Sequence, residues 1–224
     1  MKIVLVNAST RKNGATAKIL NEFAGQLKLY GDTEVSLFHL SDLTVGFCKG
    51  CCLCYKTGKC FINDDADMLS EIIGKADGVI IGTPNYVSNV SGQLKTFIDR
   101  GHFVFEQLLK DKYAIGVVTY ENAMGGSVYN ILKNLFIFSG AKTSDKLIVK
   151  VPFNSDPLAS KKVKASVKHK ADKLYKSILH KKPRSLVNTI IHFFVLNIGI
   201  KPFVLKKGEL YEGILLNWKN RGII

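Results

Sequence analysis

The sequence predicts an α/β fold in which a doubly wound, five-stranded parallel sheet is covered by helices on both faces. Short apolar runs rich in Val and Ile alternate with longer segments whose apolar residues repeat at helical spacing. The apolar runs are nearly continuous, as in strands that are buried on both faces. With 224 residues, the chain is long enough for one such domain and short for two.

Strands are predicted at residues 2–6, 34–40, 78–82, 113–119 and 145–151. Helices are predicted at residues 16–29, 66–76, 92–109, 128–139 and 159–179. The first helix illustrates the pattern, because Ile19, Phe23 and Leu27 fall on one face. Five units of this kind fit a flavodoxin-like sheet with the strand order 2-1-3-4-5. In that sheet, ligands bind beyond the carboxyl ends of the strands, where the strand order reverses.

Residues 1–182 are expected to form this domain, with a cysteine-rich loop at 44–64, and residues 183–224 remain as a C-terminal extension. The net charge of +14 is uneven, since residues 150–224 hold sixteen Lys and Arg against four Asp and Glu, and residues 1–149 hold sixteen against fourteen. An anionic partner near the C-terminus, such as a membrane surface, is one explanation. Solvated lysines on amphipathic helices are the simpler one. Nucleic acid is not expected as a partner.

The first apolar run is too short for a secretory signal, so we expect a cytoplasmic protein with reduced thiols. The most apolar stretch, residues 186–205, is interrupted by Asn188, His192, Asn197, Gly199, Lys201 and Pro202. A membrane-spanning helix is therefore not expected there. Packing on the core, on a second subunit or on a membrane surface all remain open. Trp218 is expected to anchor the extension on the body or on a second subunit.

The loop between the first strand and the first helix is suited to bind a phosphate. Residues 9–16 read Ser-Thr-Arg-Lys-Asn-Gly-Ala-Thr, so hydroxyls, an amide and two cations stand before a helix start. Backbone N–H groups and the helix dipole favour an anion there. An ordinary polar turn with a capping hydroxyl is the alternative. The loop is neither a P-loop nor a dinucleotide fingerprint, because both glycine patterns are missing.

Two further loops follow the third and fourth predicted strands. After the third strand, Pro84 stiffens the exit, Tyr86 offers a flat face, and Asn85 and Ser88 offer hydrogen bonds. After the fourth strand, residues 119–127 contain a pair of glycines that permit a ligand to approach the backbone. These are the positions at which the ring of a nucleotide-like ligand would lie.

Two motifs in this strand-loop-helix context resemble those of the NAD(P)H-dependent FMN reductases and the related iron–sulfur flavoproteins. They are Ser-x-Arg-Lys-Asn-Gly-x-Thr and Thr-Pro-x-Tyr-x4-Ser-Gly-Gln-Leu-Lys-x-Phe-Ile-Asp-Arg, and the resemblance covers residues 1–150. It implies that FMN is bound, with its phosphate held by Ser9, Arg11, Asn13, Gly14, Ala15 and Thr16. The isoalloxazine edge would contact Pro84, Asn85, Tyr86, Val87 and Ser88, flanked by Gly125 and Gly126. Ala15, often Asn in the family, and Asn85, often apolar, depart from the family pattern.

The cysteines form a second signal. Cys48, Cys51, Cys54 and Cys60 follow the spacing C-x2-C-x2-C-x5-C, with Cys52 in addition. Four soft ligands on one short loop can hold a [4Fe–4S] cluster, and the spacing is similar to that of the iron–sulfur flavoproteins. Reduced thiols in a folded loop, a zinc site and a redox disulfide are the alternatives.

The resemblance implies an FMN-dependent oxidoreductase that takes a hydride from NAD(P)H. The acceptor would be a quinone, a flavin, a metal or a protein, reached directly or through the cluster. No catalytic side chain is named, because the flavin carries the chemistry. The alternatives are an electron-carrier flavoprotein that does not turn over pyridine nucleotide, and a protein whose basic tail is the working part. The resemblance also implies a homodimer.

Overall fold

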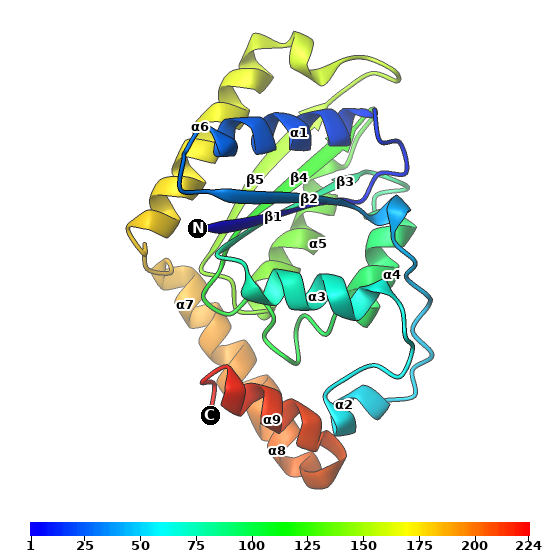
Figure 1. The fold of residues 1–224 in the computed structure, drawn as a ribbon, viewed down its shortest axis with the longest axis vertical. Helices are drawn as coiled ribbons and strands as arrows, with labels where there is room; N and C mark the ends of the chain where they lie inside the picture. The colour runs from blue at the N-terminus through cyan, green and yellow to red at the C-terminus, as the bar shows by residue number, and fades with distance from the viewer.

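The central sheet has five parallel strands in the order β2-β1-β3-β4-β5, which confirms the predicted fold (Figure 1). The strands are β1 (Lys2–Asn7), β2 (Glu34–His39), β3 (Gly78–Pro84), β4 (Tyr113–Tyr120) and β5 (Thr143–Lys150). The computed structural model describes residues 1–224, apart from the side chain of Ser144. Because β1 lies between β2 and β3, the chain reverses its winding direction beside β1, and a crevice forms there at the carboxyl end.

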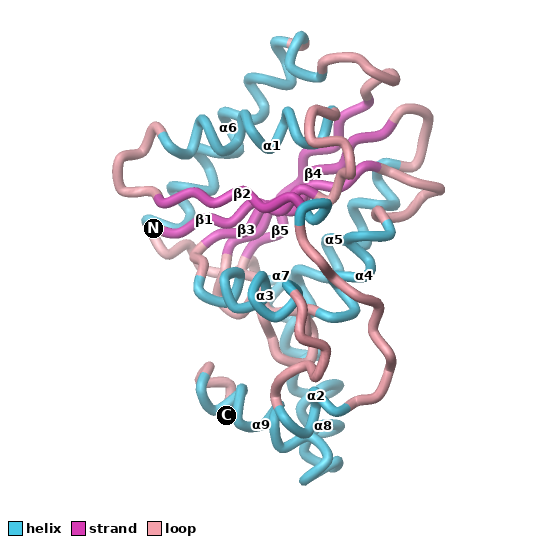
Figure 2. The backbone as a smooth tube through the Cα atoms, turned by 45° about the vertical axis from the view of Figure 1, so that its right-hand side comes forward, coloured by secondary structure: helices cyan, strands magenta, loops and turns pink.

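Alternate side chains of each inner strand feed two separate cores. On one face, α1 (Ala15–Lys28) and α6 (Lys161–Leu179) cover a core that includes Ile3, Leu5 and Ile80. On the other face, α3 (Asp65–Lys75), α4 (Gly92–Arg100) and α5 (Gly125–Phe138) cover a core that includes Val4, Val6 and Ile81. Figure 2 shows the helices in these two layers. The near-continuous apolar strands therefore result from burial on both sides.

The predicted helix at 92–109 is too long, because α4 ends at Arg100. Gly101 caps the helix, and His102, with φ of 53°, breaks the helical path. A series of turns follows to residue 111, held partly by the buried Gln107, whose amide donates to the carbonyls of Val104 and Phe138. These turns are as buried as a helix would be, so the apolar pattern of the sequence does not reveal the change.

The C-terminal extension is helical. It consists of α7 (Leu186–Phe193), the π-helical segment η3 (Phe194–Ile200), α8 (Lys201–Lys207), the 3-10 turn η4 (Gly208–Tyr211) and α9 (Glu212–Asn220). Segments α7, η3 and α8 run on as one rod, and α9 folds back beside α8 and α2 (Leu53–Thr57), a short helix inside the cysteine-rich loop (Figures 1 and 2). The sequence pattern does not predict α2.

The extension holds the cysteine-rich loop through a small core of its own. Leu196, Val204, Ile214 and Trp218 are buried together, with Tyr55 of α2 packed against them. Trp218 is fully buried, and its indole N–H donates to the carbonyl of Phe105 at 2.7 Å. The tryptophan therefore anchors the extension on the body of the same chain, which is one of the two predicted roles.

Two glycines allow the backbone of α9 to contact the backbone that follows α2. A Cβ on Gly213 of α9 would lie only 1.9 Å from the backbone nitrogen of Gly58, directly after α2. The Asn217 amide adds a hydrogen bond of 3.3 Å to the Gly58 carbonyl. No larger residue fits at position 213 without moving one of the two segments.

We expect Trp218→Ala to lower the free energy of unfolding by about 3–5 kcal/mol, because it leaves a large cavity and an unpaired carbonyl in this small core. Urea unfolding followed by circular dichroism measures the effect. Leu216→Ala is the control, since Leu216 lies on the same helix with 57% of its surface exposed and should change the stability little. Equal losses in the two variants would contradict the anchoring role of Trp218.

Candidate functional site

Four loops at the carboxyl end of the sheet surround the main cavity, whose volume is about 1080 Å³. They follow β1, β3, β4 and β5, and contribute residues from 11–18, 84–88, 119–124 and 151–155. Small-molecule sites commonly measure ~300–1,000 Å³, so the cavity has room for a nucleotide-sized ligand. Its place beyond the strand ends is the one predicted from the strand order.

The loop after β1 makes one end of the cavity cationic. Arg11, Lys12 and Lys18 all line the cavity. The buried Ser9 hydroxyl shapes this loop by accepting a hydrogen bond from the Arg11 N–H at 3.2 Å. Helix α1 begins after Gly14 without a side-chain cap, so its first N–H groups point towards this end. The geometry is suited to a phosphate.

The loop after β3 forms the opposite wall and has unusual backbone geometry. Val87 and Ser88 both have positive φ, 50° and 60°, between the paired backbones of Tyr86 and Asn89. A β-branched residue rarely adopts this conformation, and such strain clusters at ligand sites. Val87 is fully exposed and Tyr86 is nearly half exposed, so an aromatic and an apolar side chain stand free at the cavity.

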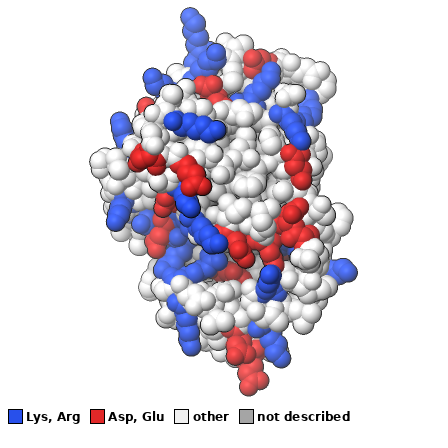
Figure 3. Space-filling view, viewed as in Figure 1, with Lys and Arg blue, Asp and Glu red and all other residues white. Residues whose placement is uncertain are grey.

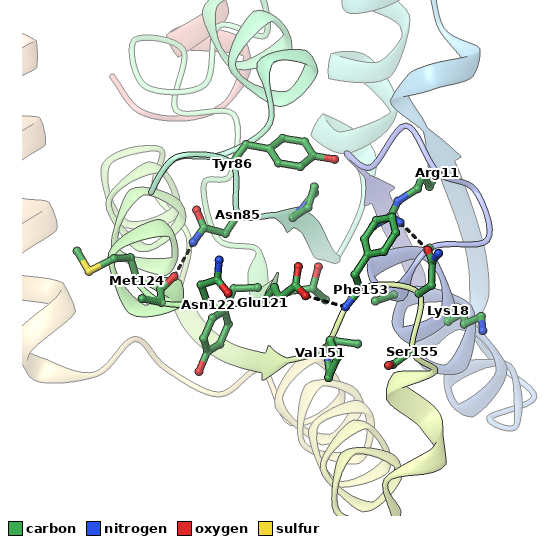
Figure 4. Close-up of a pocket in the computed structure, with 18 of the residues that line it drawn as sticks. Arg11, Lys18, Asn85, Tyr86, Glu121, Asn122, Met124, Val151, Phe153 and Ser155 are labelled. Carbon is green, nitrogen blue, oxygen red and sulfur yellow. Dashed lines mark hydrogen bonds between the residues drawn. The ribbon is translucent and has the colours of Figure 1, made fainter.

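Asn85 joins the second and third loops of the site. Its side-chain N–H donates to the carbonyl of Ala123 at 2.7 Å, as Figure 4 shows. The Asn85 Oδ1 atom is buried and has no hydrogen-bond partner among the residues that the structure describes. A buried acceptor without a partner is costly, and a donor on a bound ligand would satisfy it.

The fourth loop, after β5, lies beside the cationic end of the cavity. The Phe153 ring lies 5.1 Å from the guanidinium carbon of Arg11, and Arg11 donates to the Asn154 side chain at 3.2 Å. The Phe153 N–H is held at 3.1 Å by a carboxylate oxygen of Glu121 from the loop after β4. In Figure 4 the Phe153 ring stands between Arg11 and Tyr86. An aromatic side chain is therefore available on each side of the cavity.

The structure brings most of the predicted FMN residues together around this cavity. Those that line it are Arg11, Asn13, Gly14, Ala15, Pro84, Asn85, Tyr86, Val87 and Ser88. Ser9 and Thr16 lie behind it as buried supports, Thr16 through a hydrogen bond of 2.7 Å to the Thr119 hydroxyl. Gly125 and Gly126 start α5, just beyond the cavity wall. A Cβ on Gly125 would lie 2.6 Å from the Tyr120 ring, so this glycine serves packing.

The loop after β5 lines the cavity, above all through Phe153 and Asn154, and was not predicted from the sequence. The strand order offered a signal, because all five carboxyl ends meet at one edge and β5 is among them. The loop itself, Val-Pro-Phe-Asn-Ser, carries no recognisable pattern. Lys18, on the first turn of α1, also lines the cavity and was not predicted, whereas Lys12 and Glu121 belong to loops that the sequence had pointed to.

The cysteine-rich loop lies away from the main cavity. Cys48, Cys51 and Cys52 are exposed, and Cys54 and Cys60 are partly exposed. Cys48, Cys52 and Cys54 line a second cavity of about 220 Å³, which Cys51 and Cys60 do not reach. Within the described residues, no three thiol, imidazole or carboxylate groups converge as metal ligands. The donor chemistry suits an iron–sulfur cluster, but the predicted four thiols are not assembled around one point.

An ion pair borders this second cavity. The Nδ1 atom of His102 lies 2.7 Å from a Glu106 carboxylate oxygen, and both residues line the cavity. Burial alone would lower the pKa of His102, but hydrogen bonds with Cys54 and Glu106 raise it to about 10. Arg221, directly after α9, lies 3.7 Å from the other Glu106 oxygen. The extension therefore contributes to the environment of the cysteines.

Arg100 ties the two ends of the cysteine-rich loop together. Its guanidinium donates to the Gly46 carbonyl at 2.9 Å, to the Ile62 carbonyl at 3.2 Å and to both oxygens of Asp64, at 2.8 and 2.9 Å. Burial by itself would raise the pKa of Asp64, but hydrogen bonds from Arg100, Gly46 and Ala66 hold it below its usual value. The pair is nearly inaccessible to solvent.

Comparison with known proteins gives similarities to one family, to two relatives and to one solved structure. Residues 1–155 match the family described as NADPH-dependent FMN reductase. An iron–sulfur flavoprotein of Clostridioides difficile is 38% identical over 226 residues, which cover 100% of both chains. An iron–sulfur flavoprotein of Archaeoglobus fulgidus is 38% identical over 124 residues, which cover 54% of each chain. The fold is also similar to that of an NADH:FMN oxidoreductase, with a TM-score of 0.60 and 21% identity, covering 79% of this chain and 89% of that one.

We expect Arg100→Met to lower the free energy of unfolding by about 3–5 kcal/mol at neutral pH, because it leaves Asp64 buried without its partner. Lys95→Met, in the exposed pair with Asp99 on the same helix, should cost less than about 1 kcal/mol. Urea unfolding measures both.

The difference in the free energy of unfolding between wild type and Arg100→Met should also depend on pH. The pKa of Asp64 is lower in the native protein than in the unfolded chain, where it is about 4. The stabilisation by the ion pair is therefore complete above that value and is lost as the pH falls below it. A difference that stays constant through this acid range would contradict the role of the ion pair.

Proposed function

Because the chain belongs to the NADPH-dependent FMN reductase family, we propose that it binds FMN in the main cavity and passes electrons from NAD(P)H to a second acceptor. Membership makes it an FMN reductase-like oxidoreductase. One observation carries the choice of site: a nucleotide-sized cavity has a cationic end at the start of α1 and an amide and aromatic wall opposite. FMN, when bound, supplies the redox chemistry, which is the acceptance of a hydride and the release of its two electrons singly or as a pair.

The residues of the chain divide the binding of FMN between them. Arg11, Lys12 and the first N–H groups of α1 would hold the phosphate, with Ser9 and Thr16 fixing the loop from behind. Asn85 would offer its unpaired oxygen to a ring N–H, and Tyr86 would contact the ring. The two backbone hydrogen bonds between Tyr86 and Asn89 hold this wall in place before the ligand arrives, which reduces the entropic cost of binding.

We name the second electron acceptor only by its chemical class. A quinone, a free flavin, a metal or a protein would each fit an open cavity with an exposed aromatic edge. We also infer a homodimer, because a second subunit would cover the exposed Val87 and Tyr86, and the extension offers further surface. The alternative, an electron carrier without turnover of pyridine nucleotide, differs in one measurable property: it would oxidise almost no NAD(P)H in the presence of an artificial acceptor.

For the cysteine-rich loop, we propose a [4Fe–4S] cluster held by Cys48, Cys51, Cys54 and Cys60. The support is the spacing of four thiols on one short loop and the name of the relatives, iron–sulfur flavoproteins. Arg100 and α9 fix the base and one side of the loop, while Cys48 and Cys51 are exposed and Cys54 and Cys60 are partly exposed. Binding of the cluster would therefore draw together a loop that is held only at its base and side. Reduced thiols in the same loop remain the alternative.

The FMN proposal predicts that purified protein retains about one FMN per chain after addition of the cofactor and desalting. Arg11→Met should weaken FMN binding about tenfold or more, because a charge-assisted hydrogen bond to phosphate contributes ~1.5–3 kcal/mol. Binding of riboflavin, which lacks the phosphate, should change much less. Titration followed by flavin fluorescence measures both ligands, and Lys28→Met at the other end of α1 is the control. Equal losses for both flavins, or protein that stays colourless, would contradict the proposal.

The cluster proposal predicts about four irons and four acid-labile sulfides per chain in protein purified without oxygen. Cys48→Ser and Cys51→Ser should each abolish the broad absorbance of the cluster. Cys52→Ser is the matched control, because Cys52 lies in the same loop but outside the predicted set, and it should keep the iron. Iron-free anaerobic wild type would contradict the cluster. Loss of iron in Cys52→Ser with retention in Cys51→Ser would show a different set of ligands.

A further inference from the structure

The rod formed by α7, η3 and α8 has one side attached to the protein and one side free. On the attached side, Arg184 donates to the Gly140 carbonyl at 2.7 Å, His192 contacts the Ile137 carbonyl, and Leu196 and Val204 are buried. The free side carries a stripe of apolar side chains between 49% and 76% exposed. This apolar stripe consists of Leu186, Val187, Ile190, Phe193, Phe194 and Ile198.

The surroundings of the apolar stripe are strongly basic. Between residues 185 and 200 there is no Asp, Glu, Lys or Arg. Residues 161–207, which lead into and include the rod, hold thirteen Lys or Arg and one acidic residue, Asp172. Lys181 and Lys182 lie directly before the rod, and Lys206 and Lys207 end it. Figure 3 shows basic side chains along the edge that α6 and the start of the rod occupy.

The stretch Leu186–Asn220 is long and apolar enough to cross a membrane by length and composition, and only 11% of its most apolar window is buried. The expectation from the sequence was that this stretch does not span. In the fold, the apolar residues of only one side of this stretch are buried. Helix α9 turns back, and the attached side packs on the body and around Trp218. An element that is fixed on one side and apolar on the other is suited to lie on a bilayer.

We propose that the apolar stripe docks this protein onto the surface of an anionic lipid bilayer. The Phe and Ile side chains enter the boundary between headgroups and acyl chains, and the neighbouring Lys and Arg contact anionic headgroups. A second copy is a poorer occupant of the stripe, since the thirteen Lys and Arg of residues 161–207 would then lie close to the same residues of that copy. The homodimer inferred above would instead cover Val87 and Tyr86, at the main cavity. The proposal is independent of the FMN chemistry.

Docking has a consequence for the cysteine-rich loop. The rod packs through α9 against α2, and α2, α8 and α9 lie together at one end of the molecule in both views (Figures 1 and 2). The four loops of the main cavity belong to the carboxyl edge of the sheet instead. In a docked molecule the cysteine-rich loop therefore lies beside the attached side of the rod, while the main cavity lies at the edge of the sheet.

Flotation of the full-length protein with vesicles tests the proposal. We expect binding to vesicles that contain about one third phosphatidylglycerol, little binding to pure phosphatidylcholine, and a marked loss at high salt. Phe193→Ser/Phe194→Ser should reduce binding at least about tenfold. Leu186→Ser/Val187→Ser, at the most exposed positions, is a second variant in case the first folds poorly. Leu29→Ser, an equally exposed leucine at the end of α1, is the control and should bind like wild type.

Three outcomes would overturn the proposal. One is wild-type protein that does not float with anionic vesicles at low salt. Another is a wild-type dimer that the Phe variant converts to monomers while vesicle binding is absent, since the stripe would then be an interface between copies. The third is bound protein that resists extraction by alkaline carbonate, which would indicate a spanning helix. Retained FMN and NAD(P)H oxidation in the variants would separate these results from a failure of the proposed function.

Discussion

The buried ion pair between Arg100 and Asp64 is the interaction on which the arrangement of the two sites depends. Arg100 ends α4, whose start is capped by Ser91 in the loop that follows the β3 wall of the main cavity. Asp64 caps α3 and also receives the Gly46 N–H, so the same carboxylate closes the cysteine-rich loop. A charge buried this deeply is tolerated because both terminal nitrogens of the guanidinium have hydrogen-bond partners and a carboxylate faces them. The pair therefore links the position of the cysteines to the helix that leaves the main cavity.

The extension adds a second restraint from the opposite side. Gly213 and Gly58 bring two backbones into contact, and Trp218 fixes α9 to the turn after α4 through the Phe105 carbonyl. The turns between residues 101 and 111, which replace the helix predicted there, thus serve as a common support. They carry His102 and Glu106 to the cysteines and Phe105 to the extension. The turns at residues 101–111, the cysteine-rich loop and the extension all lie outside the sheet and stabilise one another.

Local patterns made the sheet, its strand order and two walls of the main cavity predictable from the sequence. Val and Ile runs identify buried strands, and the polar residues after β1 and β3 stand beside those runs in the chain. Phe153 was not predicted, because the loop after β5 has no recognisable sequence pattern, although the predicted strand order already brought the end of β5 to this edge. The end of α4 was missed for a related reason, since buried turns and buried helices share the same apolar composition. The grouping of Cys48, Cys52 and Cys54 depends on the short helix α2, which no periodicity announces.

The rod shows why composition alone left its role open. Sixteen residues without Asp, Glu, Lys or Arg are compatible with a core helix, an interface or a membrane contact. Only the attachment through Arg184, His192 and Trp218 decides which side is used by the fold, and so which apolar residues are left over. What is left over is a contiguous stripe beside a cluster of lysines, whereas an ordinary surface helix exposes apolar residues singly. The fold does not bury this stripe, which is why we propose a contact outside the chain for it.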